Sequence, residues 1–511
     1  MSFHSFNQNN LIMKKTSLLV LFGLIIIISF TLVECTGSDK KEPADVAVNT
    51  ITPVPLPTNI VPGFVFPEDS TTILGWTNDS TFANYYDSVK IYKHAWGVWA
   101  GLTAESGQKY AGDNLLVYET WLGLNEVRDL VVDNNMQGGC AGVSFNRKGR
   151  APLSRPKQFE HAARFSAQKG TPAAFKQTVS ENNVNFWVTV SYSPDAACYA
   201  TQNQIFKQSV INKYYSTGGL GAIPPFPNKS ITTKPTYMVY DDTAVQFRLP
   251  VWLTAPVPAN DNFWANANDY VFVDRANKQP DGKVAVPVDS TEKDPAKIAA
   301  ATINLKDFIY LTIDAEMAKE MNRQDSVQGM NNSGNGYGVA KKGQIALLVA
   351  MHVTTKEISN WTWQSFYWTP DRNNPGSPSS SLAASLRPSQ IKGAASNYAC
   401  VAAYVMLTPG NTPNNLAKGS MFGYNPYLEG GFGSSVFTYP NTYNASYQYG
   451  VQSNCMSCHA LAIPSPAAQY STDQTIDLAG PYFKNQVSLD FAWSIQQALI
   501  NDSIPYWQTK K

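Results

Sequence analysis

The chain carries many short hydrophobic runs that are bounded by turn-forming residues. These runs are rich in Val, Ile, Thr and aromatic side chains, and Pro, Asn and Gly stand between them. Runs of this kind are typical of β-strands. We therefore expect strands at Asn185–Tyr192, Tyr237–Tyr240, Ala244–Thr254, Asp269–Asp274, Thr302–Ile313, Gln344–Thr355 and Trp361–Trp368.

Helical spacing of hydrophobic residues is scattered. Near the C-terminus, Ser488–Asn501 begins with a capping Ser and places Phe491, Ile495 and Leu499 on one face, as in an amphipathic helix. The mixture predicts an α+β fold, with a large β-rich mixed domain, scattered helices and a short irregular and helical C-terminal segment. Further helices are expected at Asn84–Leu102, Pro156–Gln168, Gln202–Tyr215 and Asp314–Asn322.

The N-terminus has the layout of an export signal. Lys14 and Lys15 precede an apolar run over residues 17–33, and Cys35 follows shortly after it. This order is typical of a bacterial lipoprotein signal, so we expect a signal peptide over residues 1–35 with lipid attachment at Cys35. The residue before the Cys is normally small, but here it is Glu34, and the alternative is an uncleaved N-terminal anchor. Either alternative exports the chain and tethers it to a membrane.

The rest of the chain divides into three parts. Residues 36–62 are polar and then Pro-rich, which predicts an extended tether. Residues 63–445 show no internal repeat and are expected to form the large α+β domain. Residues 446–511 form a short segment around the motif described below. A chain of 511 residues is long enough for this division.

Composition narrows the classes of function. The formal net charge is +1, so there is no basic excess for neutralising phosphates, and we expect no nucleic-acid partner. Hydrophobic residues make up 43% of the chain and aromatic residues 12%, which argues against a disordered protein. The chain contains only five histidines, so each can be considered individually.

A single short motif carries recognisable chemistry. Cys455, Cys458 and His459 form C-x-x-C-H, the attachment signature of c-type haem. In this chemistry the two thiols add to the haem vinyl groups, and the adjacent histidine is placed to bind the iron. A thioredoxin-like pair would need a βαβ context, which the flanks do not supply. A zinc site would need further ligand pairs that the sequence lacks. We therefore predict one covalent haem c, with its iron.

The second axial ligand of the iron must come from upstream, because no Met or His follows His459. His352 ends a hydrophobic run that predicts a buried strand, and it is our first choice. Its neighbour Met351 would point to the opposite face of the strand, so only one of the two can face the haem. His161 lies in a polar segment and is interpreted as a surface residue. The remaining alternatives are Met421, His94 (more simply a satisfied core residue), a weaker donor or an open site.

Other polar residues admit two interpretations. Of Cys140, Cys198 and Cys400, two can pair in an oxidising compartment, with Cys140 and Cys198 as the first choice, or all three are buried thiols. Glu119 and Glu429 stand beside aromatic residues, and they line a cavity or have a structural role. The predicted helix at Ser488–Asn501 packs either on the haem edge or on the large domain.

The chain resembles a family of exported bacterial monohaem c-type cytochrome-like proteins of about this length, with a large N-terminal domain and a C-terminal C-x-x-C-H motif. The resemblance implies haem c and export, raises His352 as a haem-pocket residue, and implies no particular reaction. The chain departs from the pattern at His94-Ala95, where relatives have Ser, and at Tyr367-Trp368, where relatives often have Glu-His. The matching stretches are His94–Leu102, Tyr118–Trp121, Phe226–Ile231 with Lys234, Ile303–Phe308, Met351–Lys356, Trp361–Phe366, Asn425–Glu429 and Cys455–His459.

Three functions are compatible with these observations. The leading hypothesis is a membrane-tethered, extracytoplasmic c-type cytochrome of the periplasm or outer-membrane surface, transferring electrons to redox partner proteins of the cell envelope. The first alternative is a haem enzyme, such as a peroxidase or small-molecule oxidase, with an open iron site. The second alternative is a surface binding protein in which the haem is structural.

Overall fold

The structure is a computed structural model, and it describes residues 50–82, 86–133, 140, 145–156, 186–241, 243, 245–253, 269–289, 291–327, 339–405, 421, 423–429, 455–464 and 478–502. The predicted signal over residues 1–35, including Cys35, lies outside the described residues, as do His161 and the predicted helix at Pro156–Gln168 apart from its first residue. Among the described residues, no helix is both long and apolar enough to cross a membrane.

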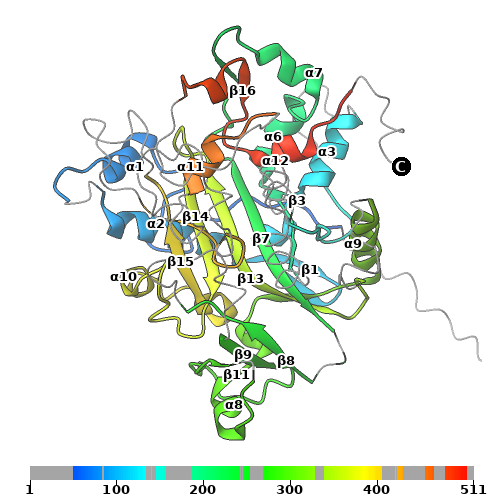
Figure 1. Cartoon of the computed structure of the whole chain (residues 1–511), viewed down its shortest axis with the longest axis vertical. Helices are drawn as coiled ribbons and strands as arrows, with labels where there is room; N and C mark the ends of the chain where they lie inside the picture. The colour runs from blue at the N-terminus through cyan, green and yellow to red at the C-terminus, as the bar shows by residue number, and fades with distance from the viewer. Residues whose placement is uncertain are drawn as a thin grey trace, which may run out of the picture. The chain divides into compact units, whose positions relative to one another are not determined.

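The α+β fold class is confirmed, and its centre is a large antiparallel sheet (Figure 1). The longest strands are β7 (Ile231–Tyr240) and β13 (Ile345–Thr355), which lie side by side. On the far side of β13 follow β14 (Thr362–Trp368) and then β15 (Tyr398–Ala402). The shorter members are β3 (Leu122–Gly123), β4 (Phe186–Val188), β5 (Ser191–Tyr192) and β12 (Tyr310–Thr312).

The two faces of this sheet pack against different groups of residues. On one face α2 (Ser88–Leu102) lies against β15, and Trp99 stacks on Phe366 of β14 with ring centroids 4.4 Å apart. Met351 of β13 is opposite Phe366 and belongs to the same core. On the other face, Trp361 and Trp363 join a second core that includes the C-terminal residues. Because successive side chains of a strand point to opposite faces, the alternate residues of these strands pack into two separate hydrophobic cores.

The C-terminal elements are part of this second core. α11 (Cys455–Ala460) and α12 (Trp493–Ala498) lie near the same end of the main sheet (Figure 1). β16 (Gln486–Ser488) pairs in parallel with β6 (Leu220–Ala222). In the part of the chain that the structure describes, the C-terminal segment thus shares its core with the domain that precedes it.

The second half of the predicted tether differs from the expectation. Ile51 is 1% exposed and forms a bridge with Arg147, and Leu56 packs on Gly101 of α2. The indole of Trp121 donates to the carbonyl of Val54. Residues 50–62 therefore lie on the domain, because Leu56 belongs to the first core and Val54, Ile60 and Val61 pack against it.

Other helices and strands surround the sheet. A second, smaller sheet contains β8 (Gln246–Pro250), β9 (Asp269–Asp274), β10 (Val288–Asp289) and β11 (Thr302–Asn304), and it lies with α8 (Pro295–Ala301) at the end away from α11 (Figure 1). β1 (Glu105–Tyr110) and β2 (Asp113–Leu116) form a separate two-stranded antiparallel sheet. Within the described ranges, the other α-helices are α1 (Ser70–Thr77), α3 (Leu124–Val132), α6 (Pro194–Gln202), α7 (Gln208–Ile211), α9 (Ala315–Val327) and α10 (Ser381–Ser385).

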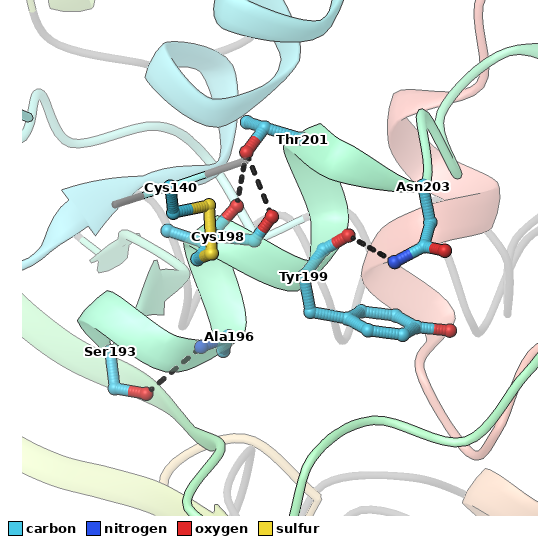
Figure 2. The surroundings of a disulfide bond; sticks show 8 residues. Cys140, Ser193, Ala196, Cys198, Tyr199, Thr201 and Asn203 are labelled. Carbon is cyan, nitrogen blue, oxygen red and sulfur yellow. Dashed lines mark hydrogen bonds between the residues drawn. A yellow bond between two sulfur atoms is a disulfide. The ribbon is translucent and has the colours of Figure 1, made fainter. Parts of the chain in front are cut away.

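The predicted pairing of Cys140 with Cys198 is confirmed (Figure 2). Cys198 lies in α6, whose first turn is capped by the Ser193 hydroxyl. Cys140 follows α3, and α3 packs on α6. The disulfide therefore joins two neighbouring parts of the second core. Cys400 is a buried free thiol in β15.

Candidate functional site

The C-x-x-C-H motif forms a single short helix, α11. Because residues three and four apart share a helix face, Cys455, Cys458 and His459 can point the same way, and all three line one cavity. Met456, between them, is fully buried in the second core and anchors the opposite side of the helix. The Cys455 amide donates to the Gly423 carbonyl at 3.0 Å, and its thiol lies 2.6 Å from the same oxygen.

The His459 ring is fixed on one side and open on the other. Its Nδ1 donates to the carbonyl of Phe491 at 2.8 Å, and the ring packs on Trp363 with centroids 4.2 Å apart. Nε2 makes no hydrogen bond to any described residue. Burial lowers the pKa of His459 to about 3, against the opposing effect of the Phe491 hydrogen bond. The ring is therefore a neutral imidazole whose Nε2 lone pair is available to a metal.

Burial also governs the two thiols. It raises the pKa of Cys455 and the pKa of Cys458 well above their usual range, and the nearby Glu429 carboxylate adds to the effect. The two sulfurs are not bonded to each other. A reactive dithiol site needs thiolates, which depend on a lowered pKa. The surroundings thus oppose thiolate formation and do not favour dithiol redox chemistry.

The cavity beside α11 has about 1070 Å³ of empty space, part of it open to solvent. The main sheet forms one wall, and the residues between β16 and α12 form another. Its lining comprises Val190, Thr232, Thr233, Lys234, His352, Thr354, Trp361, Trp363, Gly423, Tyr424, Glu429, Cys455, Cys458, His459, Asp490, Phe491, Ala492, Trp493, Ser494 and Gln497.

Strand register explains which residues the sheet contributes. In the antiparallel β7–β13 pair, Lys234 is opposite His352 and Thr232 is opposite Thr354. Directly opposed residues share a face of the sheet. Trp363 of β14 is opposite Thr354 and extends the same face. These five side chains therefore form one continuous surface of the cavity.

His352 and its partners form the polar part of this wall. Its Nε2 lies 3.0 Å from a carboxylate oxygen of Glu429. The other oxygen of Glu429 accepts from the backbone amide of Asn425 at 2.6 Å. Burial lowers the pKa of Lys234 to about 8, against the opposing attraction of Glu429. The sequence allows Glu429 to line a cavity or to have a structural role; in the structure it lines the cavity and also holds the Asn425 backbone.

The other predicted ligands are placed differently. His94 is buried, and both ring nitrogens are occupied, Nδ1 by the Tyr404 hydroxyl at 2.7 Å and Nε2 by Glu357 at 3.1 Å. Met351 and Met421 are buried in the first core and do not line the cavity. Of the His and Met candidates that the structure describes, His352 alone shares the cavity with His459.

Glu119 has a structural position. Its carboxylate is 3.2 Å from Arg150 and accepts the Leu116 amide at 2.9 Å. It does not line the cavity. Burial raises its pKa, and the charge of Arg150 opposes that rise.

Sequence reasoning missed several residues that hold His459. The Phe491 carbonyl, the Trp363 ring and the Asp490 carboxylate all act around the cavity, but none forms a recognisable motif with the C-x-x-C-H sequence. The Phe491 carbonyl and the Asp490 carboxylate lie inside the segment Ser488–Asn501, which the sequence predicts to be a helix. Asp490 and Phe491 have φ values of 50° and 67°, which are incompatible with a helix, and α12 begins only at Trp493.

The residues around the cavity fit a covalently attached haem. Two adjacent thiols and an imidazole with a free Nε2 line a space with aromatic walls. Within the described residues, no three His, Cys, Asp or Glu side chains form a group that could hold a bare metal ion. A porphyrin-bound iron needs only one or two axial ligands from the protein.

The chain was compared with protein-family models, with curated proteins and with solved structures, and it matches none of them.

Proposed function

We propose that this protein is an extracytoplasmic c-type cytochrome that carries one covalent haem and transfers electrons. The observation that carries the proposal is the joint placement of Cys455, Cys458 and His459 on the wall of one cavity, with the Nε2 atom of His459 open. Cys455 and Cys458 would form the thioether bonds, and His459 would be the proximal ligand. When bound, the haem supplies the one-electron chemistry.

The chain's own residues would set the properties of the iron. The Phe491 carbonyl orients the His459 ring and increases its basicity, as hydrogen-bonded partners of metal-binding histidines generally do. The indoles of Trp361 and Trp363 and the Phe491 ring restrict water around the site. We propose His352 as the distal ligand, since it faces the same cavity.

The proposed location is the cell envelope, in the periplasm or at the outer-membrane surface, with a lipid at Cys35 as the tether. The export-type sequence before Cys35 supports this location. The disulfide between Cys140 and Cys198 supports it as well, because disulfides persist mainly in oxidising compartments. The expected partners are redox proteins of the same compartment.

Export of the full chain in a bacterium that matures c-type cytochromes tests this function. The purified protein should give a pyridine haemochrome spectrum of one haem c, and reductant should change its absorption reversibly. The Cys455→Ala/Cys458→Ala double variant is the matched control and should lack covalent haem. A wild-type protein without this spectrum would overturn the proposal.

A specific contact favours a second candidate, a haem enzyme with an open iron site. Nε2 of His352 is already held by Glu429, and ligation by that nitrogen requires it to leave this carboxylate. If it stays, His352, Glu429 and Lys234 would instead surround a small ligand on the iron. Carbon monoxide added to the reduced protein discriminates: a shifted Soret band supports the open site, and an unchanged band supports ligation by His352.

A further inference from the structure

The carbonyl that holds His459 belongs to an unusual turn. In the segment Leu489–Ala492, the Ala492 amide donates to the Leu489 carbonyl at 2.9 Å, and both central residues have positive φ. Turns of this kind are usually occupied by Gly, Asn or Asp. Asp490 suits such a position, but Phe491 does not, because a bulky side chain is disfavoured in the left-handed region. Contacts outside the turn must therefore stabilise it.

A buried ion pair supplies these contacts. Nζ of Lys356, which follows β13, lies 2.5 Å from Oδ1 of Asp490 and also donates to the Ser359 carbonyl at 2.7 Å. Oδ2 of Asp490 accepts the amide of Phe226 at 3.1 Å. The Lys356 and Asp490 side chains are only 6% and 12% exposed. Removing either partner would leave a buried charge without its counter-charge, which strongly disfavours the existing arrangement.

The turn connects this ion pair directly to the site. The residue that follows Asp490 is Phe491, whose carbonyl accepts Nδ1 of His459. Trp363 contacts both rings, with centroids 4.2 Å from His459 and 6.5 Å from Phe491. The ring orientation of His459 thus depends on the conformation of the turn.

We propose that Lys356 and Asp490 are positioning residues for His459, because their ion pair holds the turn whose Phe491 carbonyl binds Nδ1. This inference rests on the proposed haem attachment. A hydrogen bond at Nδ1 makes the imidazole a stronger donor, which favours the oxidised iron. A loosened turn should therefore raise the reduction potential.

The Lys356→Gln variant separates positioning from a simple charge effect. Loss of a positive charge near the haem would by itself lower the reduction potential, because it stabilises the ferric form. Loss of the turn raises the potential. We expect the variant to have a higher potential than the wild type, and we expect Lys356→Arg, which keeps the ion pair, to remain near the wild-type value. A potential equal to or below the wild-type value in Lys356→Gln would overturn the proposal.

A second measurement does not depend on the potential. With ¹⁵N-labelled histidine, five residues at most give ring signals, and the Nδ1 proton of His459 should exchange slowly with solvent. We expect the Asp490→Asn variant to exchange the Nδ1 proton of His459 faster than the wild type does. This variant also replaces Lys356→Gln as the test if Lys356→Gln does not fold. Unchanged exchange in that variant would overturn the positioning role.

The chain offers a matched control in a second buried ion pair. Nε of Arg155 lies 3.3 Å from Asp325, with side-chain exposures of 3% and 1%, and neither residue lines the cavity. Asp325→Asn should leave both the reduction potential and the exchange of the His459 Nδ1 proton unchanged. If Asp325→Asn changed them as much as the Lys356 and Asp490 variants do, the loss of any buried charge would explain the changes, and the positioning role would be overturned. A wild-type protein without covalent haem is a different result, because it would overturn the proposed function itself.

Discussion

The two cavity histidines differ in what their ring nitrogens already hold. His459 binds a backbone carbonyl through Nδ1, and its Nε2 is open to the cavity. His352 binds a carboxylate through Nε2. The two residues are close enough for His352 to contribute to lowering the pKa of His459. In the proposed cytochrome they would therefore have unequal roles: His459 would be a preorganised ligand, and His352 would have to leave Glu429 before its Nε2 could bind the iron.

The His352→Ala variant tests the distal role. If His352 binds the iron, its removal opens a coordination position, and the reduced variant should bind carbon monoxide while the wild type does not. Absorption spectra with and without carbon monoxide measure this. Equal binding by both proteins would contradict ligation by His352 and would favour the open-site enzyme.

The His94→Leu variant tests the structural role of the buried histidine. It would leave Glu357 and the Tyr404 hydroxyl without one hydrogen-bond partner each, at a cost of about 1–3 kcal/mol. Denaturant unfolding measures this loss, and the haem spectrum should not change. A changed spectrum with unchanged stability would contradict this placement.

At the scale of elements, strands were easier to predict than the connections between them. The expected strand at Asp269–Asp274 coincides with β9, and Gln344–Thr355 and Trp361–Trp368 each begin one residue before β13 and β14. β14 is buried at every position and β13 at all but His352, so the hydrophobicity of these two runs directly reflects their environment. Thr302–Ile313 is instead divided into β11 and β12 by a short 3₁₀ turn, because Asp307 caps the Asn304 amide.

The site itself was predictable only where a local motif carries it. Cys455, Cys458 and His459 are recognisable from their spacing, and His352 from the strand that contains it. Lys356, Asp490 and the Phe491 carbonyl meet through tertiary contacts across more than a hundred residues. No local pattern could reveal them, and Phe491 suggested a helix where the backbone is left-handed.

Burial of α12 predicts that the C-terminal segment is required for stability. Ile495 is fully buried in the second core, and Ile495→Ala should lower the free energy of unfolding by about 2–5 kcal/mol. The matched control is Leu478→Ala, at a side chain that is 52% exposed, with an expected change within about 0.5 kcal/mol. Urea unfolding measures both, and equal losses would contradict the packing.

At the scale of the whole molecule, one disulfide stabilises the region around the second core. Cys140 and Cys198 are 58 residues apart in sequence, so their bond restricts a long loop of the unfolded chain. The Cys140→Ser/Cys198→Ser double variant should lose about 2–4 kcal/mol of stability. Thermal unfolding measures the loss, and the haem content should be unchanged. A variant as stable as the wild type would contradict this role.

The large domain places the C-x-x-C-H motif within a shared core. Its sheet supplies one wall of the cavity, helices α3 and α6 contribute residues to the second core, and Leu56 packs into the first core. An electron-transfer protein needs only part of this framework. The framework does, however, define the cavity on the His352 side. Carbon monoxide binding to the reduced protein therefore decides between electron transfer and a haem enzyme with an open iron site.

In the proposed function, Cys455 and Cys458 carry a covalent haem. Peptide mass mapping of the exported, denatured protein, after extraction of any non-covalent haem, tests it most directly. We predict that the peptide containing Cys455–His459 carries the mass of one haem and that neither thiol reacts with an alkylating reagent. Two alkylated thiols, or a disulfide between Cys455 and Cys458, would contradict the claim.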